Sequence, residues 1–264
     1  MDEQILNSVK DTFGNFNQAI QEVIKMVSAS PDTNAGMWHV ATTIYNVILP
    51  IGLSLAGLYF IIDFLNKSVM LEYVRWENIV KSLFRLVVAK IILQNAFKLM
   101  TLILGVATQI VGNIGTTTPN MSNIDYSAIQ KTIEGMGLFE KLGYWIQLYP
   151  LSFIMTIVQF GISLIVIGRM FEIYVYTALA PIPLAGLTGE GSVGIAKNFL
   201  RNYAGVCLQG VIIVVCCTLY GGLIQDVVIQ PGLSGLKDFV MYSLVLLLVL
   251  IKSGSWANKL TGGM

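Results

Sequence analysis

Lysine and glutamine side chains recur at helical spacing within an otherwise apolar stretch. Lys90, Gln94 and Lys98 lie four residues apart, so on a helix they share one face. On insertion scales, a cation in a membrane-spanning helix costs about 2.5 to 3.5 kcal/mol unless it contacts water, a partner or the interior of a bundle. We call these three residues the polar seam and expect them to point away from lipid.

Two interpretations of the polar seam remain open. In the first, both lysines extend toward the membrane surface, and the helix packs through small residues further along the same face. In the second, the seam lines an aqueous path or a subunit interface, where a cation can also meet an anionic lipid or a polyanionic substrate.

A second charged pair, Arg169 and Glu172, follows a long apolar run. The two residues are three positions apart, which brings their side chains together on one helix. They are interpreted either as a structural ion pair that lets the helix bend at the membrane face, or as a gating or coupling element.

Two prolines break the next apolar segment. Pro181 and Pro183 lack a backbone donor and clash with the preceding helical turn, and Gly186 follows them closely. We therefore predict a bent elbow or re-entrant piece, shaped by these three residues, with a sixth membrane crossing as the alternative.

Enzymatic and cofactor chemistry has little support in the residue types. The glycines between Gly189 and Gly194 match the spacing of a dinucleotide loop, but they follow Pro-Ile-Pro instead of a buried strand. Three cysteines share one apolar run with His39 as the single histidine elsewhere, which is not a zinc pattern. We predict no catalytic residues, no cofactor, no metal and no enzyme activity.

The composition indicates a polytopic membrane protein. Of 264 residues, 55% are hydrophobic and 12% are charged, against about a quarter charged in soluble domains. The net charge of +1 gives no global field that would attract a polyanion. The predicted fold is all-α with about five transmembrane helices, each long enough for a hydrocarbon core of about 30 Å.

The predicted spans are separated by loops of unequal charge. The spans cover residues 38–62, 82–114, 144–168, 202–229 and 238–257. Between and after them lie a cytoplasmic loop, an outside loop, the elbow with an inner-face helix, and a cytoplasmic tail, at residues 63–81, 115–143, 169–201 and 258–264. Lysine and arginine are more frequent in the loops assigned to the cytoplasm, which predicts an outside N-terminus and a cytoplasmic C-terminus.

Residues 1–30 precede the first span and carry an apolar stripe at intervals of three and four, which includes Phe13, Phe16, Ile20 and Val23. This pattern predicts an amphipathic helix outside the membrane. Either the stripe packs on the protein's own surface or on lipid headgroups, or the helix docks on copies of itself or on a partner.

The elbow and its flanks resemble a known family. The stretch from Tyr176 to Leu187, the Gly-Glu-Gly-Ser turn and the segment from Ala196 to Tyr203 resemble the core of TrbL-type conjugal transfer proteins, in the short form found in conjugative elements of Gram-positive bacteria. These are polytopic inner-membrane subunits of type IV secretion systems.

The resemblance implies a bacterial cell-membrane subunit that works with other secretion components, including membrane proteins and ATPases, and that forms a homo-oligomeric ring in contact with membrane lipids. It implies transient contact with DNA or protein substrate. We expect a scaffold and translocation-channel subunit that helps pass DNA with its relaxase, or protein, across the membrane. The alternatives are a small-solute or ion transporter and an assembly factor without substrate contact.

Overall fold

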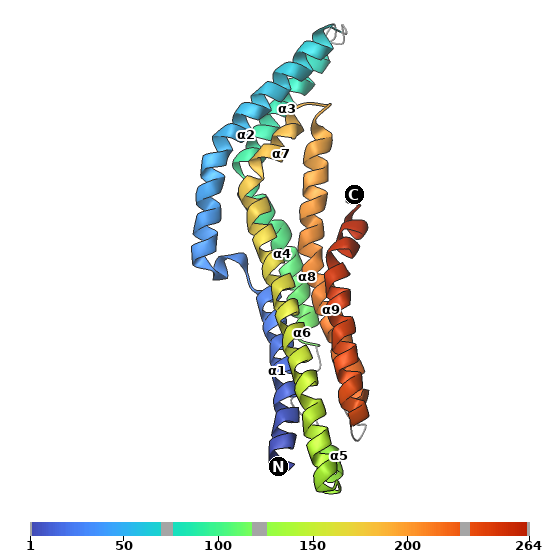
Figure 1. Ribbon diagram of the computed structural model, residues 1–264. Helices are drawn as coiled ribbons and strands as arrows, with labels where there is room; N and C mark the ends of the chain where they lie inside the picture. The colour runs from blue at the N-terminus through green and yellow to red at the C-terminus, as the bar shows by residue number, and fades with distance from the viewer. Residues whose placement is uncertain (1, 70–75, 118–125, 228–232, 263–264) are drawn as a thin grey trace. The chain divides into compact units, whose positions relative to one another are not determined.

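The computed structural model describes residues 2–69, 76–117, 126–227 and 233–262, and this part of the chain is helical with no strand. Figure 1 shows long helices joined by short connections. The helices are α1 Asp2–Ser28, α2 Ala35–Val69, α3 Trp76–Gln94, α4 Ala96–Gly115, α5 Ser127–Glu134, α6 Leu138–Leu179, α7 Pro181–Leu184, α8 Val193–Val227 and α9 Leu233–Thr261, with 3-10 turns η1 Pro31–Thr33 and η4 Ala185–Thr188.

Five of these helices are long and apolar enough to cross a membrane. They comprise Ala35–Val69, Ala96–Gly115, Leu138–Leu179, Val193–Ile224 and Lys237–Thr261. The prediction of an all-helical polytopic membrane protein is confirmed. At about 1.5 Å per residue, the 42 residues of α6 extend well past the roughly 30 Å hydrocarbon core, so only part of this helix lies in lipid.

The stretch predicted as one span over 82–114 forms two helices, α3 and α4, separated at Asn95. The Asn95 amide Nδ2 donates to the Ile91 carbonyl at 2.9 Å, and its backbone N–H is shared between the carbonyls of Ile91 and Ile92. A side chain that bonds to the preceding turn competes with regular helical geometry. Because the apolar pattern continues through this residue, hydropathy alone does not reveal the interruption.

The chain folds as two compact units. The first unit contains Met1–Ala29, Thr108–Gly168 and Gln209–Gly254, and the second contains Ser30–Ala107, Arg169–Leu208 and Ser255–Met264. Each has its own buried side chains. The elbow and the polar seam belong to the second unit, whereas the apolar stripe of α1 belongs to the first.

The core of the first unit is built around the α1 stripe. Phe13, Phe16, Ile20 and Val23 are all buried. Phe16 packs against Tyr220 of α8 and Phe239 of α9, with ring centroids 5.5 and 5.6 Å apart. The stripe therefore packs on the chain's own helices, and none of these four side chains is exposed to a second protein.

The Phe16 ring provides a direct test of this packing. We expect Phe16→Ala to destabilise the fold by about 3 to 5 kcal/mol, because it removes a buried ring and leaves a cavity. The measurement is the thermal unfolding temperature of the full chain in mild detergent. The exposed neighbour Asn15→Ala serves as the matched control and should leave that temperature unchanged. Equal unfolding temperatures for Phe16→Ala and Asn15→Ala would contradict this packing.

Candidate functional site

The candidate site is the proline elbow with the helices that hold it. Helix α6 ends at Leu179, and the chain turns through α7 and η4 before α8 begins at Val193. Pro181 opens α7, at a position where its missing N–H costs no helical hydrogen bond. Because α7 has four residues, the segment forms a bent elbow here instead of a membrane-crossing helix.

The elbow packs closely against α2. A Cβ atom at Gly52 would lie 2.7 Å from the Pro181 Cβ, and one at Gly186 would lie 2.6 Å from the Ser192 carbonyl oxygen. The Thr188 hydroxyl donates to the Ala56 carbonyl at 3.0 Å. Glycine is therefore required at 52 and 186 for the backbones to approach, and Gly52 has no signal in the sequence because it lies within an ordinary apolar run.

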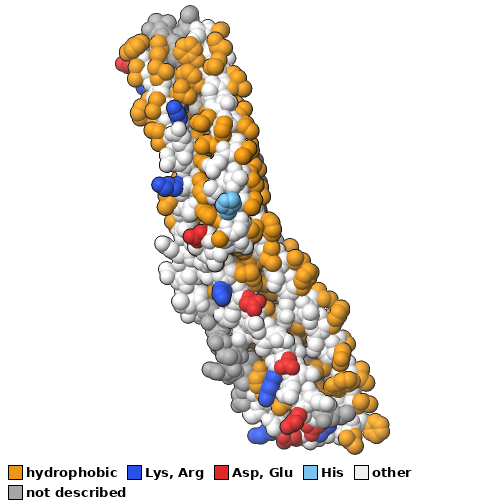
Figure 2. Space-filling view, turned by 90° about the vertical axis from the view of Figure 1, so that its left-hand side faces the viewer, with side chains coloured by type: hydrophobic (Ala, Val, Ile, Leu, Met, Phe, Trp, Pro, Cys, Tyr) orange, Lys and Arg blue, Asp and Glu red, His pale blue; other side chains and the backbone are white. Residues whose placement is uncertain are grey.

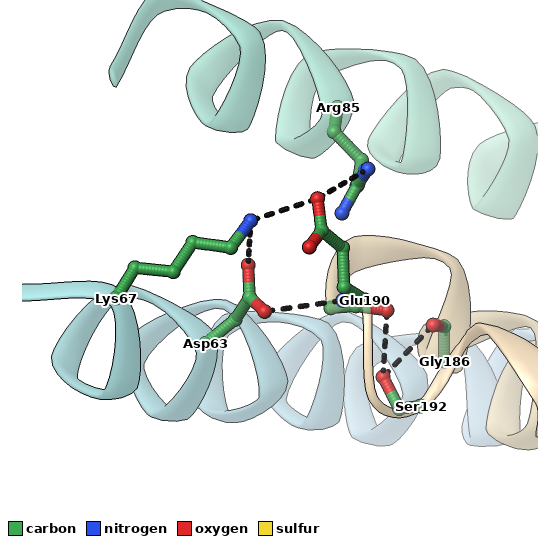
Figure 3. A network of polar contacts seen from close by, with 7 residues as sticks. Asp63, Lys67, Arg85, Gly186, Glu190 and Ser192 are labelled. Carbon is green, nitrogen blue, oxygen red and sulfur yellow. Dashed lines mark hydrogen bonds and ion pairs between the residues drawn. The ribbon is translucent and has the colours of Figure 1, made fainter. Parts of the chain in front are cut away.

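Four charged residues close the elbow, and we call them the elbow clamp: Asp63 and Lys67 of α2, Arg85 of α3 and Glu190 of the turn before α8 (Figure 3). The Glu190 carboxylate Oε1 lies 2.8 Å from Lys67 Nζ and 3.0 Å from Arg85 Nη2. Lys67 Nζ also lies 3.2 Å from Asp63 Oδ2. The clamp joins three segments that are far apart in sequence.

Hydrogen bonds between side chains and the backbone shape the turn that carries Glu190. The Glu190 N–H donates to Asp63 Oδ1 at 3.2 Å. The Ser192 hydroxyl donates to the carbonyls of Gly186 and Gly189 at 2.9 and 3.3 Å, as Figure 3 shows. These bonds fix the carboxylate in front of Lys67 and Arg85, so the glycine-rich turn acts as a structural connection.

The electrostatics of the clamp favour its ionised form. The hydrogen bond from the Lys67 ammonium, with a further one from Arg85, lowers the pKa of Glu190 below its ordinary value of 4.5. A polar cavity of about 120 Å³ adjoins the clamp, lined by Lys67, Asn78, Lys81, Ser82, Arg85 and Glu190. The clamp is only partly exposed, since the Lys67 and Asp63 side chains are 13% and 12% exposed and that of Glu190 is 56% exposed. Its ion pairs set the positions of α2, α3 and the turn relative to one another.

The three residues of the polar seam lie on two helices, since Lys90 and Gln94 belong to α3 and Lys98 to α4. All three side chains are exposed in the single chain. The interruption at Asn95 therefore divides the seam between two helices, and its role stays a prediction.

Arg169 is buried, with 3% of its surface exposed. Its Nε donates to the Val206 carbonyl at 3.0 Å, and Nη2 donates to the Cys207 carbonyl at 3.3 Å. Glu172 is exposed, and the ion pairs of the described residues do not include these two. Arg169 therefore connects α6 to α8, which spacing along one helix cannot show, and its pairing with Glu172 stays a prediction.

The comparisons with known proteins give one match. Residues 16–181 match the protein-family model described as TrbL/VirB6 plasmid conjugal transfer like protein. The matched residues run from α1 through α6 to the first residue of α7. No curated protein and no solved structure matches the chain.

The partners of Arg169 can be tested by comparing two substitutions. We expect Arg169→Gln to destabilise the fold by about 1.5 to 3 kcal/mol, because charge-assisted bonds to two carbonyls are lost. Glu172→Gln should change stability by less than about 0.5 kcal/mol. The measurement is thermal unfolding in detergent, and an equal loss in both variants would show that the two residues act as a pair.

The clamp predicts a pH dependence. A carboxyl whose folded-state pKa is lowered stabilises the fold above its unfolded pKa, and that stability disappears as pH falls through the folded value. We expect Glu190→Gln to unfold at a lower temperature than the wild type at pH 7, with the difference shrinking below about pH 4.5.

The control for the clamp is Glu77→Gln, at an exposed position of α3, which should match the wild type at every pH. The measurement is the unfolding temperature of all three proteins between about pH 3 and pH 7. A constant difference between wild type and Glu190→Gln across that range would show that the Glu190 carboxylate contributes no ionisation-linked stability.

Proposed function

The chain belongs to the TrbL/VirB6 plasmid conjugal transfer family, and from this premise we propose that it is a scaffold and translocation-channel subunit. In this role it helps to pass DNA with its attached relaxase, or protein substrate, across the cell membrane. The observation that carries the proposal is the family match over residues 16–181, together with the five apolar helices.

The family gives the broad function. Membership identifies a multi-pass cell-membrane subunit of a conjugative type IV secretion system, which associates with other components of that system. We propose that partner ATPases supply the energy, that the copies form a ring, and that the N-terminus lies outside and the C-terminus in the cytoplasm. The positive charge of the loops assigned to the cytoplasm supports this orientation.

The polar seam supports the channel role. Lys98 lies within the candidate span α4, and its side chain is exposed in the single chain. An ammonium at membrane depth is favourable only where water, a partner or the bundle interior replaces lipid. We propose that neighbouring copies and an aqueous path surround Lys90, Gln94 and Lys98.

The elbow supports the scaffold role. The clamp and the close contact at Gly52 hold α2, α3 and the start of α8 in one arrangement. Such a rigid connection can position the polar seam relative to the elbow, since both belong to the same compact unit.

The test is the transfer frequency of the conjugative element in cells that carry variants of this chain. We expect Lys90→Leu with Lys98→Leu to lower transfer by about tenfold or more, because the two cations are lost from the proposed aqueous path. A tenfold loss corresponds to about 1.4 kcal/mol in the free-energy barrier to transfer. The matched control, Lys90→Arg with Lys98→Arg, keeps both charges and should retain transfer. Unchanged transfer in the leucine variant, at equal protein level, would remove the seam from the mechanism.

Two further measurements separate the alternatives. Solute or ion flux through liposomes that contain this chain alone would favour a transporter. A photo-crosslinking side chain at position 98 should react with DNA in transit if the chain lines the channel. Crosslinks to protein alone, without any to substrate, would favour an assembly factor.

A further inference from the structure

Helices α1 and α6 lie side by side and parallel within the first unit. Lys141 Nζ lies 2.8 Å from Asp2 Oδ2, and the Thr12 hydroxyl lies 3.1 Å from that of Ser152. Further along, α1 and α6 line a groove with mostly polar residues, together with Ala19 and Phe160: Asn15, Gln18, Ala19 and Glu22 on α1, and Thr156, Gln159, Phe160 and Ser163 on α6. Each contact pairs a residue of α1 with one near 140 positions later, so the two helices stay in register for most of α1.

The register places α1 beside the apolar stretches of membrane spans. From Leu142 to Gly168, α6 contains no ionisable Asp, Glu, Lys or Arg. The segments of α8 and α9 in the same core, 209–225 and 239–251, also contain none. Three uncharged segments of candidate spans thus pack together around the buried stripe of α1, so α1 lies alongside the parts of these helices that are apolar enough to cross a membrane.

Helix α6 presents two different sides along this stretch. One side is apolar and exposed, with Phe153, Ile157 and Leu164 each more than half exposed. Such a surface suits contact with acyl chains. The side next to α1 carries Thr156, Gln159 and Ser163, with Phe160 at the edge of the apolar side. The polar and the lipid-suited side chains therefore alternate around the same turns of one helix.

The outward side of α1 is charged toward both of its ends, and residues 12–21 between them contain no charged residue. Its exposed charged residues are Glu3, Lys10, Asp11, Glu22 and Lys25. In the lower part of Figure 2, apolar side chains gather along the right-hand edge, whereas charged side chains lie nearer the middle. A charged side chain in contact with hydrocarbon costs about 2.5 to 3.5 kcal/mol on insertion scales, so this side of α1 cannot face lipid.

The groove between α1 and α6 is the point where the two helices expose their polar atoms together. Its volume is about 380 Å³, which is large enough for several water molecules at about 30 Å³ each. The Gln18 amide Nε2 donates to Glu22 Oε1 at 3.0 Å on its rim. The Thr156 hydroxyl donates to the Ser152 carbonyl at 3.1 Å. The polar groups of Asn15, Gln159 and Ser163 need hydrogen-bond partners that hydrocarbon cannot supply.

We propose that the α1–α6 groove is filled with water at the depth of the membrane and that α1 forms part of the wall of an aqueous path. This inference goes beyond the proposed function, because it assigns α1 to the wall of the aqueous path for any substrate that passes through it. It also replaces the prediction of an N-terminal helix outside the membrane.

The test measures water access at pairs of adjacent residues on α6. In a full-length chain whose three native cysteines are replaced by alanine, we compare Thr156→Cys with Ile157→Cys, and Ser163→Cys with Leu164→Cys. Neighbours on a helix differ by about 1.5 Å in depth but by about 100° around the axis. The reagent is a permanently charged methanethiosulfonate, added to both sides of native membrane vesicles.

We expect the cysteines at 156 and 163 to react about tenfold faster or more than those at 157 and 164, because only a water-accessible thiol ionises and reacts. Gln18→Cys on α1 should react as the groove positions do. Protection of all groove positions would overturn the proposal, since lipid or protein would then fill the groove. Equal reaction at all four positions of α6 would also overturn it, since this stretch would then lie outside the hydrocarbon.

Discussion

Hydrocarbon offers no partner to a polar group, and this constraint governs both compact units of the chain. Backbone groups satisfy it by forming helices, which explains why the described residues contain no strand. Side chains satisfy it individually. Arg169 is buried and bonded to two carbonyls of α8. The side chains of the polar seam and of the outer side of α1 are exposed in the single chain. We propose that water or neighbouring copies cover these exposed polar surfaces.

The elbow satisfies the same constraint through tight packing and local charge pairing. Prolines end α6, and the turn that follows buries its residues against α2 because Gly52 lets the two backbones meet. The carboxylate of Glu190 is then held by Lys67 and Arg85, which come from separate helices. A rigid elbow of this kind can hold the helices of one unit in place.

Sequence patterns predicted those features that depend on neighbours along the chain. Apolar length gave the helical membrane fold, proline chemistry gave the elbow at Pro181 and Pro183, and three-four spacing gave the stripe through Phe16. Features that depend on contacts between distant segments were missed. The clamp joins residue 63 to residue 190, the partners of Arg169 lie on α8, and Gly52 has a role only because Pro181 approaches it. Hydropathy also cannot show that α1 lies beside a span, because its charged side resembles that of a soluble helix.

The central claim is that polar side chains at membrane depth are kept away from acyl chains. The most direct measurement is a structure of the assembled complex in lipid nanodiscs, at a resolution that shows bound lipid. We expect acyl-chain density along Phe153 and Ile157 of α6, and none in contact with Gln18, Glu22 or Lys98. Acyl chains packed against those three side chains would show that lipid, and not water or protein, surrounds them.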